Sequence, residues 1–235
     1  MRFVSFNANG VRARLHQLKA IGEKFKPHII AVQEIKVADE QFPLDDVKAL
    51  GYEHVHYYGQ KGHYGVALFA RQAPVKIQLG LPWRDADQQR RFIAAVYDIG
   101  GARIHVVNGY FPQGESREHP QKFPAKALFY ADVLRYLKEH CNPGEHLIVA
   151  GDMNVAPGDD DIGIGDENRK RWLQTGKCCF LPEERDWLES LMSWGLFDSY
   201  LQHLNGSSRM FSWFDYRSRA FERNPKRGLR IDLIL

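Results

Sequence analysis

Residues 2–34 read RFVSFNANGVRARLHQLKAIGEKFKPHIIAVQE, and this stretch decides the fold class. Arg2–Phe6 alternates and is rich in aromatic and branched side chains, which favours a strand. Apolar residues then recur at helical spacing until Pro27 ends the helix; they are Leu15, Leu18, Ile21 and Phe25. His28–Val32 is a short apolar run of the kind found in strands buried on both faces. The stretch therefore predicts a β–α–β unit.

Beyond residue 60 the chain holds a series of strand-like runs separated by turn residues. Hairpins of one sheet are the simplest interpretation of the first four runs, which are Tyr64–Ala70, Val75–Leu79, Phe92–Asp98 and Arg103–Asn108. Further strands are predicted at His146–Ala150, Phe211–Trp213 and Leu229–Leu235. Strands are therefore expected to outnumber helices.

Two more helices are predicted, Ala125–His140 and Glu183–Trp194. The first has an apolar face made of Leu128, Ala131, Leu134 and Leu137. Pro157–Trp172 is interpreted as a long polar loop, and loops of that length are commonly functional or mobile. Interleaved strands and helices predict an α/β (α+β) fold, a four-layer α/β/β/α sandwich in which two packed, mostly antiparallel sheets are flanked by helices. Because no repeat or long linker divides the chain, we expect a single domain over residues 1–235.

The composition restricts the classes of partner. A formal net charge of only +3 excludes a uniformly basic surface, so binding of a polyanion requires basic residues gathered on one face. Candidates for that face are Arg90-Arg91, Lys122, Lys126 and Arg169-Lys170-Arg171, although for any one of them a solvated surface charge is the simpler interpretation. Three cysteines form no disulfide framework, and neither a signal peptide nor a membrane-length apolar run is found. A soluble cytoplasmic protein is expected.

Acidic and amide residues occur at or just beyond the ends of the apolar strands. They are Asn7, Glu34, Asn108, Asp152, Asn154 and, within the last apolar run, Asp232. A carboxylate beside a buried strand end is costly to desolvate unless it is paired or binds a metal. Each residue alone has an ordinary alternative as a cap or turn residue, but several at one end of a sheet indicate a cation site.

The type of these side chains predicts which metal the site binds. The set consists of hard oxygen donors with few histidines and no cysteine, which suits Mg²⁺ or Mn²⁺ rather than Zn²⁺. Mg²⁺ commonly binds through one or two carboxylates and completes its coordination with water and substrate phosphate. Glu34 is the expected direct ligand.

Four segments resemble successive motifs of the endonuclease/exonuclease/phosphatase superfamily. They are Ser5–Gly10, Gln33–Lys36, Asn108–Gly114 and Gly151–Asn154. Further segments resemble the bacterial exonuclease III branch; they are Gly62–Ala67, Gln113–Arg117 with Lys122–Lys126, Trp172 with Gly176–Cys178, and Phe211–Arg217. One such motif is weak, but the ordered set runs from residue 1 to residue 235 and is very specific.

The resemblance implies a role for each matching residue. Asp152 takes a proton from the attacking water, Asn154 orients that water or the phosphate, and Tyr110 donates its hydroxyl to the phosphate. Glu34 holds the metal, with support from Asn7 and Asp232. The residues implied to contact DNA are Gln113, Asn168, Arg91, Trp213, Phe214 and Arg217. The aromatic segment around Trp213 is implied to line a pocket for a base-free sugar, although an ordinary core strand is its alternative interpretation.

The chain departs from the family pattern at its C-terminal end. The family carries a further strand with a Ser-Asp-His triplet, and none of the ten histidines stands in that context. The sequence ends in the apolar run Ile231–Leu235, whereas chain termini are commonly polar. We therefore expect a chain that is truncated at its C-terminal strand.

The resemblance implies a Mg²⁺-dependent (or Mn²⁺-dependent) DNA phosphodiester hydrolase of base excision repair. Its expected activities are 3′-to-5′ exonuclease on double-stranded DNA, abasic-site endonuclease, and 3′-phosphatase or phosphodiesterase. Double-stranded DNA with 3′ ends or abasic sites is the expected partner of a monomer that binds no membrane. The alternatives are a catalytically impaired DNA-binding form, which the missing triplet makes reasonable, and a related phosphatase acting on a small phosphorylated substrate.

Overall fold

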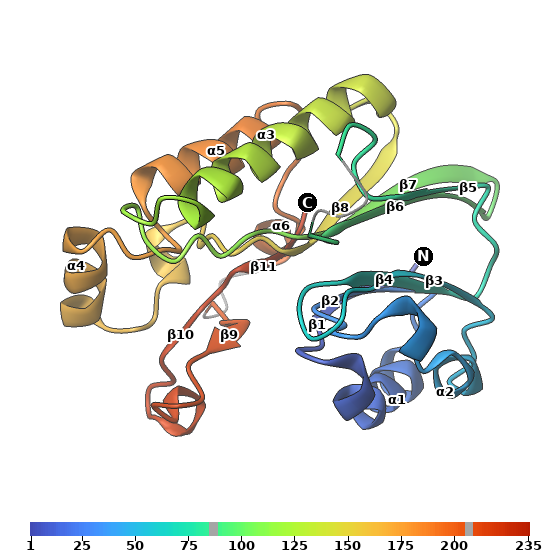
Figure 1. Cartoon of the computed structure of the whole chain (residues 1–235), viewed down its shortest axis with the longest axis horizontal. Coiled ribbons are helices and arrows are strands. Elements are labelled where there is room, and N and C mark those ends of the chain that lie inside the picture. The colour runs from blue at the N-terminus through green and yellow to red at the C-terminus, as the bar shows by residue number, and fades with distance from the viewer. Residues whose placement is uncertain (85–88, 205–208) are drawn as a thin grey trace. The chain divides into compact units, whose positions relative to one another are not determined.

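A computed structural model describes residues 1–84, 89–204 and 209–235, and its contacts define two compact units (Figure 1). The first unit comprises Met1–Tyr110, Tyr136–Asp152 and Ile234. The second comprises Phe111–Arg135, Met153–Leu233 and Leu235. Over the described residues, no helix has the length and apolar character needed to cross a membrane.

The first unit contains two complete α-helices and eight strands within the described residues. Its elements are β1 (Phe3–Asn7), α1 (Leu15–Phe25), β2 (Ile29–Gln33), α2 (Leu44–Ala49), β3 (His54–Tyr58), β4 (Val66–Ala70), β5 (Lys76–Leu79), β6 (Phe92–Ile99), β7 (Ala102–Tyr110) and β8 (His146–Asp152). The predicted β–α–β opening is confirmed by β1, α1 and β2. The strand β3 was not predicted, because four of its five residues are histidine or tyrosine and none of the five is fully buried.

The second unit contains most of the remaining elements. Helix α3 (Lys122–His140) begins in it and ends in the first unit. Its other elements are α4 (Asp166–Gln174), α5 (Pro182–Met192), α6 (Ser199–Gln202), β9 (Trp213–Phe214), β10 (Gly228–Leu229) and β11 (Asp232–Ile234), of which Ile234 is assigned to the first unit.

The strands of the first unit form two mixed sheets, and helices flank them as predicted. One sheet has the order β1-β2-β4-β3, in which β1 and β2 are parallel and the other pairs antiparallel. In the other, β8-β7-β6-β5 follow one another, with β7 and β8 parallel and the rest antiparallel. The prediction of mostly antiparallel sheets is confirmed. The prediction that Tyr64–Ala70 shares a sheet with the next three strands is wrong, because β4 pairs with β2 and β3.

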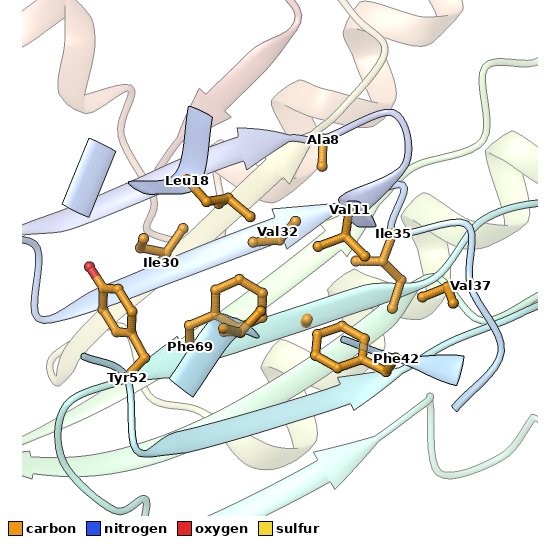
Figure 2. Packing of buried hydrophobic residues seen from close by; sticks show 12 residues of the cluster. Ala8, Val11, Leu18, Ile30, Val32, Ile35, Val37, Phe42, Tyr52 and Phe69 are labelled. Atoms are coloured by element: carbon orange, nitrogen blue, oxygen red, sulfur yellow. The ribbon is translucent and has the colours of Figure 1, made fainter. Parts of the chain in front are cut away.

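The two sheets face each other through a core of small and branched side chains. Ile29, Ala31, Val66 and Leu68 of one sheet belong to the same buried cluster as Ile93, Ala95 and Val106 of the other. The opposite face of the first sheet packs on α1 and α2, where Leu18, Phe42 and Phe69 fill a second core (Figure 2). Since β2 is covered on both faces, its continuous apolar run is explained.

A buried polar pair also joins the sheets. Gln33 of β2 donates from Nε2 to Asn108 Oδ1 of β7 at 2.7 Å, and both side chains are fully buried. Asn108 in turn donates to the carbonyl oxygens of Val32 and Ala67. Asn108 therefore acts as a structural bridge between sheets, which is the ordinary alternative that its position at a strand end left open.

Two predictions about helices are wrong in detail. In α3, Leu128 is 48% exposed and Ala131 is also exposed, whereas Phe129, Tyr130 and Val133 are buried, so that of the four predicted residues only Leu137 is fully buried. The expected loop Pro157–Trp172 contains most of α4, which begins at Asp166. That helix has strongly polar composition and no fully buried residue, and so it lacks the apolar repeat by which helices are found in sequence.

Candidate active site

The strand ends of the first unit bring three of the predicted site residues together. Asn7 ends β1, Glu34 directly follows β2, and Asp152 ends β8. The carboxyl ends of parallel strands lie at the same edge of a sheet, and β1 pairs with β2 in parallel, Asn7 opposite Gln33. Asn7 donates from Nδ2 to Glu34 Oε1 at 2.8 Å and to Asp152 Oδ2 at 2.9 Å. One amide thus holds the two carboxylates side by side.

The backbone at Glu34 adopts a conformation that most residues avoid. Its φ is 50°, in the left-handed region, which carries strain for a residue with a β-carbon. Neighbouring backbone bonds hold it there, since Gly10 donates to the Glu34 carbonyl at 2.7 Å and Ile35 donates to Gly65 at 3.1 Å. Such strain is typical of functional positions, and here it turns the Glu34 carboxylate toward Asn7.

Lys36 also belongs to this cluster, although it was not among the predicted site residues. Its ammonium lies 2.7 Å from Glu34 Oε2 and donates to the side-chain oxygen of Asn9. The Asn9 backbone N–H donates to Asn7 Oδ1 at 3.0 Å, so the contacts close a ring around the amide. The sequence feature that could have identified Lys36 is its position inside the Gln33–Lys36 motif.

Tyr110 lies beside Asp152, since the two residues are paired in the register of β7 and β8. Its hydroxyl hydrogen bonds to Glu34. Burial raises the Tyr110 pKa far above its usual value, the charges of Glu34 and Asp152 raise it further, and Arg91 opposes them. The hydroxyl therefore stays protonated and can donate a hydrogen bond to an anionic group.

Arg91 is buried, with only 7% of its surface exposed. Its guanidinium lies 4.0 Å from the Tyr64 ring centre and 4.6 Å from the Tyr110 ring centre, and Nη1 donates to the Tyr110 carbonyl at 3.1 Å. Burial lowers the Arg91 pKa, while the two tyrosines raise it. The structure thus gives Arg91 a role in supporting Tyr110, and its contact with DNA stays a prediction.

The donor set of the first unit fits a divalent cation that prefers oxygen. Glu34 and Asp152 supply carboxylate oxygens and Asn7 an amide. Among the residues that the structure describes, no group of three or more histidine, cysteine, aspartate or glutamate side chains could hold a metal. Two carboxylates and an amide suit Mg²⁺, which retains several waters and binds substrate phosphate, better than a closed zinc site.

The other predicted catalytic and metal residues, Asn154 and Asp232, belong to the second unit. Asn154 has a φ of 52°, and its Nδ2 donates to the Phe111 carbonyl at 2.9 Å. The Asp232 backbone N–H donates to Ser212 Oγ at 3.0 Å. Asn154 therefore occupies a second strained backbone position that side-chain bonding holds in place.

Lys126 is buried in the second unit rather than exposed on a basic face. Its side chain has 0% exposure and pairs with the equally buried Glu184 at 2.5 Å. The same ammonium donates to the carbonyl oxygens of Asn154 at 2.8 Å and Gln113 at 3.3 Å. Burial lowers the pKa of Lys126, but the nearby thiols and the Glu184 carboxylate outweigh it and the net pKa is raised. The ammonium thus fixes the backbone of two predicted site residues.

The predicted DNA-contacting residues of the second unit lie in three places. Asn168 and Trp213 line one cavity of about 290 Å³. Phe214 packs edge-on against Phe211 and Phe221, while Arg217 lies near the exposed Tyr216 ring. Gln113 lies elsewhere in the unit, where its side chain accepts from Glu115 N and reaches the Cys179 sulfur.

Two mixed sheets with carboxylates gathered at their strand ends indicate a metal-assisted phosphoesterase. Comparisons with known proteins support this class. Residues 4–235 match the endonuclease/exonuclease/phosphatase family. Exodeoxyribonuclease III of Haemophilus influenzae is 55% identical over 235 residues, which cover 100% of this chain and 87% of that protein. Divalent-metal dependence is general in the exonuclease III family.

Solved structures show the same relationship. A 3′ phosphatase from Neisseria bound to a product DNA hairpin is 32% identical, with a TM-score of 0.85 over 100% of this chain and 85% of that one. An AP endonuclease from Archaeoglobus fulgidus is 29% identical, with a TM-score of 0.86 over 100% of this chain and 85% of that one. The chain therefore belongs to the endonuclease/exonuclease/phosphatase family. Within that family it is an enzyme of exonuclease III type, a DNA repair nuclease.

Proposed function

We propose that the protein hydrolyses DNA phosphodiesters with Mg²⁺ or Mn²⁺ as the metal. Its proposed activities are removal of nucleotides from 3′ ends of double-stranded DNA, incision at abasic sites, and removal of 3′ phosphates. The observation that carries the proposal is the Asn7 amide bonded to both Glu34 and Asp152, beside the protonated Tyr110 hydroxyl. This arrangement provides an anionic metal-binding group, a proton acceptor and a hydrogen-bond donor in one place.

Each residue has a defined task in this proposal. Asp152 accepts the proton of the attacking water, and Asn154 orients that water or the phosphate. Tyr110 donates to a phosphate oxygen as negative charge develops on it. Glu34 holds the cation with help from Asn7 and Asp232, and a bound divalent ion supplies positive charge to the phosphate oxygens.

Contacts with DNA are assigned to both units in the proposal. The residues of the second unit that contact the DNA strand are Gln113, Asn168, Trp213, Phe214 and Arg217. Arg91 acts on the phosphate indirectly, because it holds Tyr110 in place. We further propose that the protein acts in the cytoplasm as a monomer. Three free cysteines, two of them buried, suit a reducing compartment.

A panel of substrates tests the proposed function. The full chain is incubated with duplex DNA carrying a 3′ recessed end, an abasic site or a 3′ phosphate, and with a phosphorylated small molecule, in Mg²⁺ and in EDTA. Mg²⁺-dependent release of mononucleotides, nicked strands and phosphate from the DNA substrates is expected. Hydrolysis of the small molecule alone, or DNA binding without hydrolysis in either Mg²⁺ or Mn²⁺, would contradict the proposal.

A further inference from the structure

The Cys179 thiol lies between two of the predicted site residues of the second unit. The Gln113 side chain donates from Nε2 to the Cys179 sulfur at 3.6 Å. The same thiol donates to Asn154 Oδ1 at 3.8 Å. Cys179 and Asn154 are 4% and 5% exposed, so water competes little for these groups. One buried thiol therefore connects a residue predicted to contact DNA with a residue predicted to orient the reacting water or phosphate.

Backbone groups at both ends fix the direction of this chain of hydrogen bonds. The Phe111 carbonyl can only accept, so the Asn154 amide presents Nδ2 to it, at 2.9 Å, and Oδ1 to the sulfur. The Glu115 N–H can only donate, so Gln113 presents Oε1 to it, at 2.7 Å, and Nε2 to the sulfur. Because an amide nitrogen donates and an amide oxygen accepts, the sulfur has to accept from Gln113 and donate to Asn154. A protonated thiol does both.

The orientation of the Asn154 amide depends on this second contact. Lys126 binds the Asn154 carbonyl at 2.8 Å and so holds the backbone, which has a φ of 52°. That bond does not set the rotation of the side-chain amide, because the last torsion of an asparagine side chain has broad preferences. The Phe111 carbonyl fixes the nitrogen of the amide, and the Cys179 thiol fixes its oxygen. The plane of the amide is determined only by the two contacts together.

The thiol is itself held in place by the surrounding structure. The Cys179 carbonyl accepts from the Ala156 N–H at 2.9 Å, two residues beyond Asn154. Cys179 and Ala156 also belong to one buried cluster with Phe180 and Leu181, directly before α5. A side chain that packing already fixes can orient its neighbour precisely, which is what the support of a reactive group requires.

We propose that Cys179 is a positioning residue for the reaction. Its S–H sets the orientation of the Asn154 amide, and its sulfur holds the Gln113 side chain beside it. The inference rests on the proposed function, in which Asn154 orients the attacking water or the phosphate. Cys179 acts through Asn154 and takes no part in proton transfer. Because a thiol is a weak hydrogen-bonding group, its removal affects this orientation more than it affects stability.

The test is a double-mutant cycle on the full chain. Single-turnover cleavage of a 3′ recessed duplex at saturating DNA in Mg²⁺ is measured for the parent, Cys179→Ala, Asn154→Ala and the double variant. Cys178→Ala, made in the same two backgrounds, is the matched control, because its sulfur is also buried but hydrogen bonds to Glu184. Cys179→Ser retains a donor and an acceptor. Thermal melts check folding, and DNA affinity is measured in EDTA.

Cys179→Ala is expected to cleave DNA about tenfold more slowly than the parent, because misplaced groups cost rate even where the substrate still binds. Its DNA affinity is expected to stay within a few fold. In the Asn154→Ala background the same change is expected to alter the rate by less than about twofold, because residues that act through each other are not additive. Cys179→Ser is expected to recover most of the parent rate. Cys178→Ala is expected to have the same small effect in both backgrounds.

The side-chain amide of Asn154 gives a second measurement that requires no cleavage. Its N–H resonances in the NMR spectrum of isotope-labelled protein are assigned by their absence from Asn154→Ala. They are expected to shift in Cys179→Ala, because the amide oxygen loses its donor. In Cys178→Ala they are expected to keep the positions that they have in the parent.

A parent-like cleavage rate of Cys179→Ala, or an equal loss of rate in the presence and absence of the Asn154 side chain, overturns the inference while the proposed function stands. The proposed function can fail separately. If the parent cleaves no DNA in Mg²⁺ or Mn²⁺, the amide resonances decide the role of the thiol. Resonances that shift in Cys179→Ala alone then support the positioning contact, and resonances that stay unchanged overturn it.

Discussion

At the scale of single residues, the site depends on polar groups that are fixed by their neighbours. Asn7, Glu34 and Asp152 were predictable because each directly follows or ends an apolar strand within a recognisable motif. Lys126 was not, because a buried lysine looks like a solvated one until its carboxylate partner, 58 positions away, is known. Arg91 likewise matched a phosphate contact in sequence, whereas the rings of Tyr64 and Tyr110 cover it.

Replacement of Glu34 by glutamine tests the metal site. The change keeps the shape of the side chain and removes its anionic charge, so binding of Mg²⁺ weakens and turnover falls by about 10²-fold or more at limiting Mg²⁺. DNA affinity in EDTA is expected to stay within a few fold. Nuclease rates over a Mg²⁺ titration give the measurement. A variant with the Mg²⁺ dependence of the parent removes Glu34 from the metal site.

Replacement of Lys126 by methionine tests the buried ion pair. The change leaves the Glu184 carboxylate buried without its cation and is expected to lower the free energy of unfolding by about 3–5 kcal/mol. The double variant Lys126→Met with Glu184→Gln is expected to recover much of that loss. Urea unfolding gives the comparison, and Lys122→Met on the same helix, 59% exposed, serves as the control. Equal effects at positions 122 and 126 would show that the pair has no special role.

At the scale of elements, tertiary packing determines features of the helices and strands that the apolar pattern of the sequence does not predict. The strands β1, β2 and β8 follow from apolar runs, whereas β3 and α4 consist largely of polar or aromatic residues without a clear period. In α3 the leucines suggested one face, but of them only Leu137 is fully buried, and it shares the buried face with Phe129, Tyr130 and Val133. The pairing of β4 with β2 also could not be predicted from local sequence, because it joins segments about 37 residues apart in antiparallel register.

Gly151 allows β8 to approach β7 immediately before the site. Its φ is 144°, and a β-carbon there would lie 1.8 Å from the Gly109 carbonyl oxygen of the neighbouring strand. Gly151→Ala is therefore expected to displace Asp152, lower the free energy of unfolding by about 3 kcal/mol or more, and reduce turnover. Gly144→Ala, where the nearest atom is a side-chain oxygen at 3.4 Å, is the control. Thermal melts that agree for the two variants would contradict the close approach.

At the scale of the whole molecule, weak acids that are buried or partly buried couple stability to pH. Burial raises the pKa of the Cys141 thiol to about 11, with a smaller contribution from the Glu145 charge. Burial also raises the pKa of Tyr136 to about 12. A group whose pKa is higher in the folded state stabilises the protein fully below its unfolded pKa, and the contribution disappears as pH rises through the folded value.

Stability is therefore expected to fall as pH rises from about 9 toward 11. Cys141→Ala removes one of the groups responsible, so its melting temperature is expected to fall less steeply over that interval than that of the parent. Melting temperatures at closely spaced pH values between 8 and 10.5 give the comparison. Parallel curves for the parent and the variant would show that Cys141 does not titrate in this way.

We propose that the cluster around Asn7, Glu34, Asp152 and Tyr110 performs phosphodiester hydrolysis with Asp152 as the base. The most direct measurement is single-turnover cleavage of a 3′ recessed duplex in Mg²⁺ by the parent and by Asp152→Asn, with DNA affinity measured in EDTA. The substitution keeps the size of the side chain and removes the proton acceptor. If Asp152 is the base, the cleavage rate of the variant is lower by about 10²–10⁴-fold, and its DNA affinity is within a few fold of that of the parent. A variant that binds and cuts as fast as the parent would contradict it.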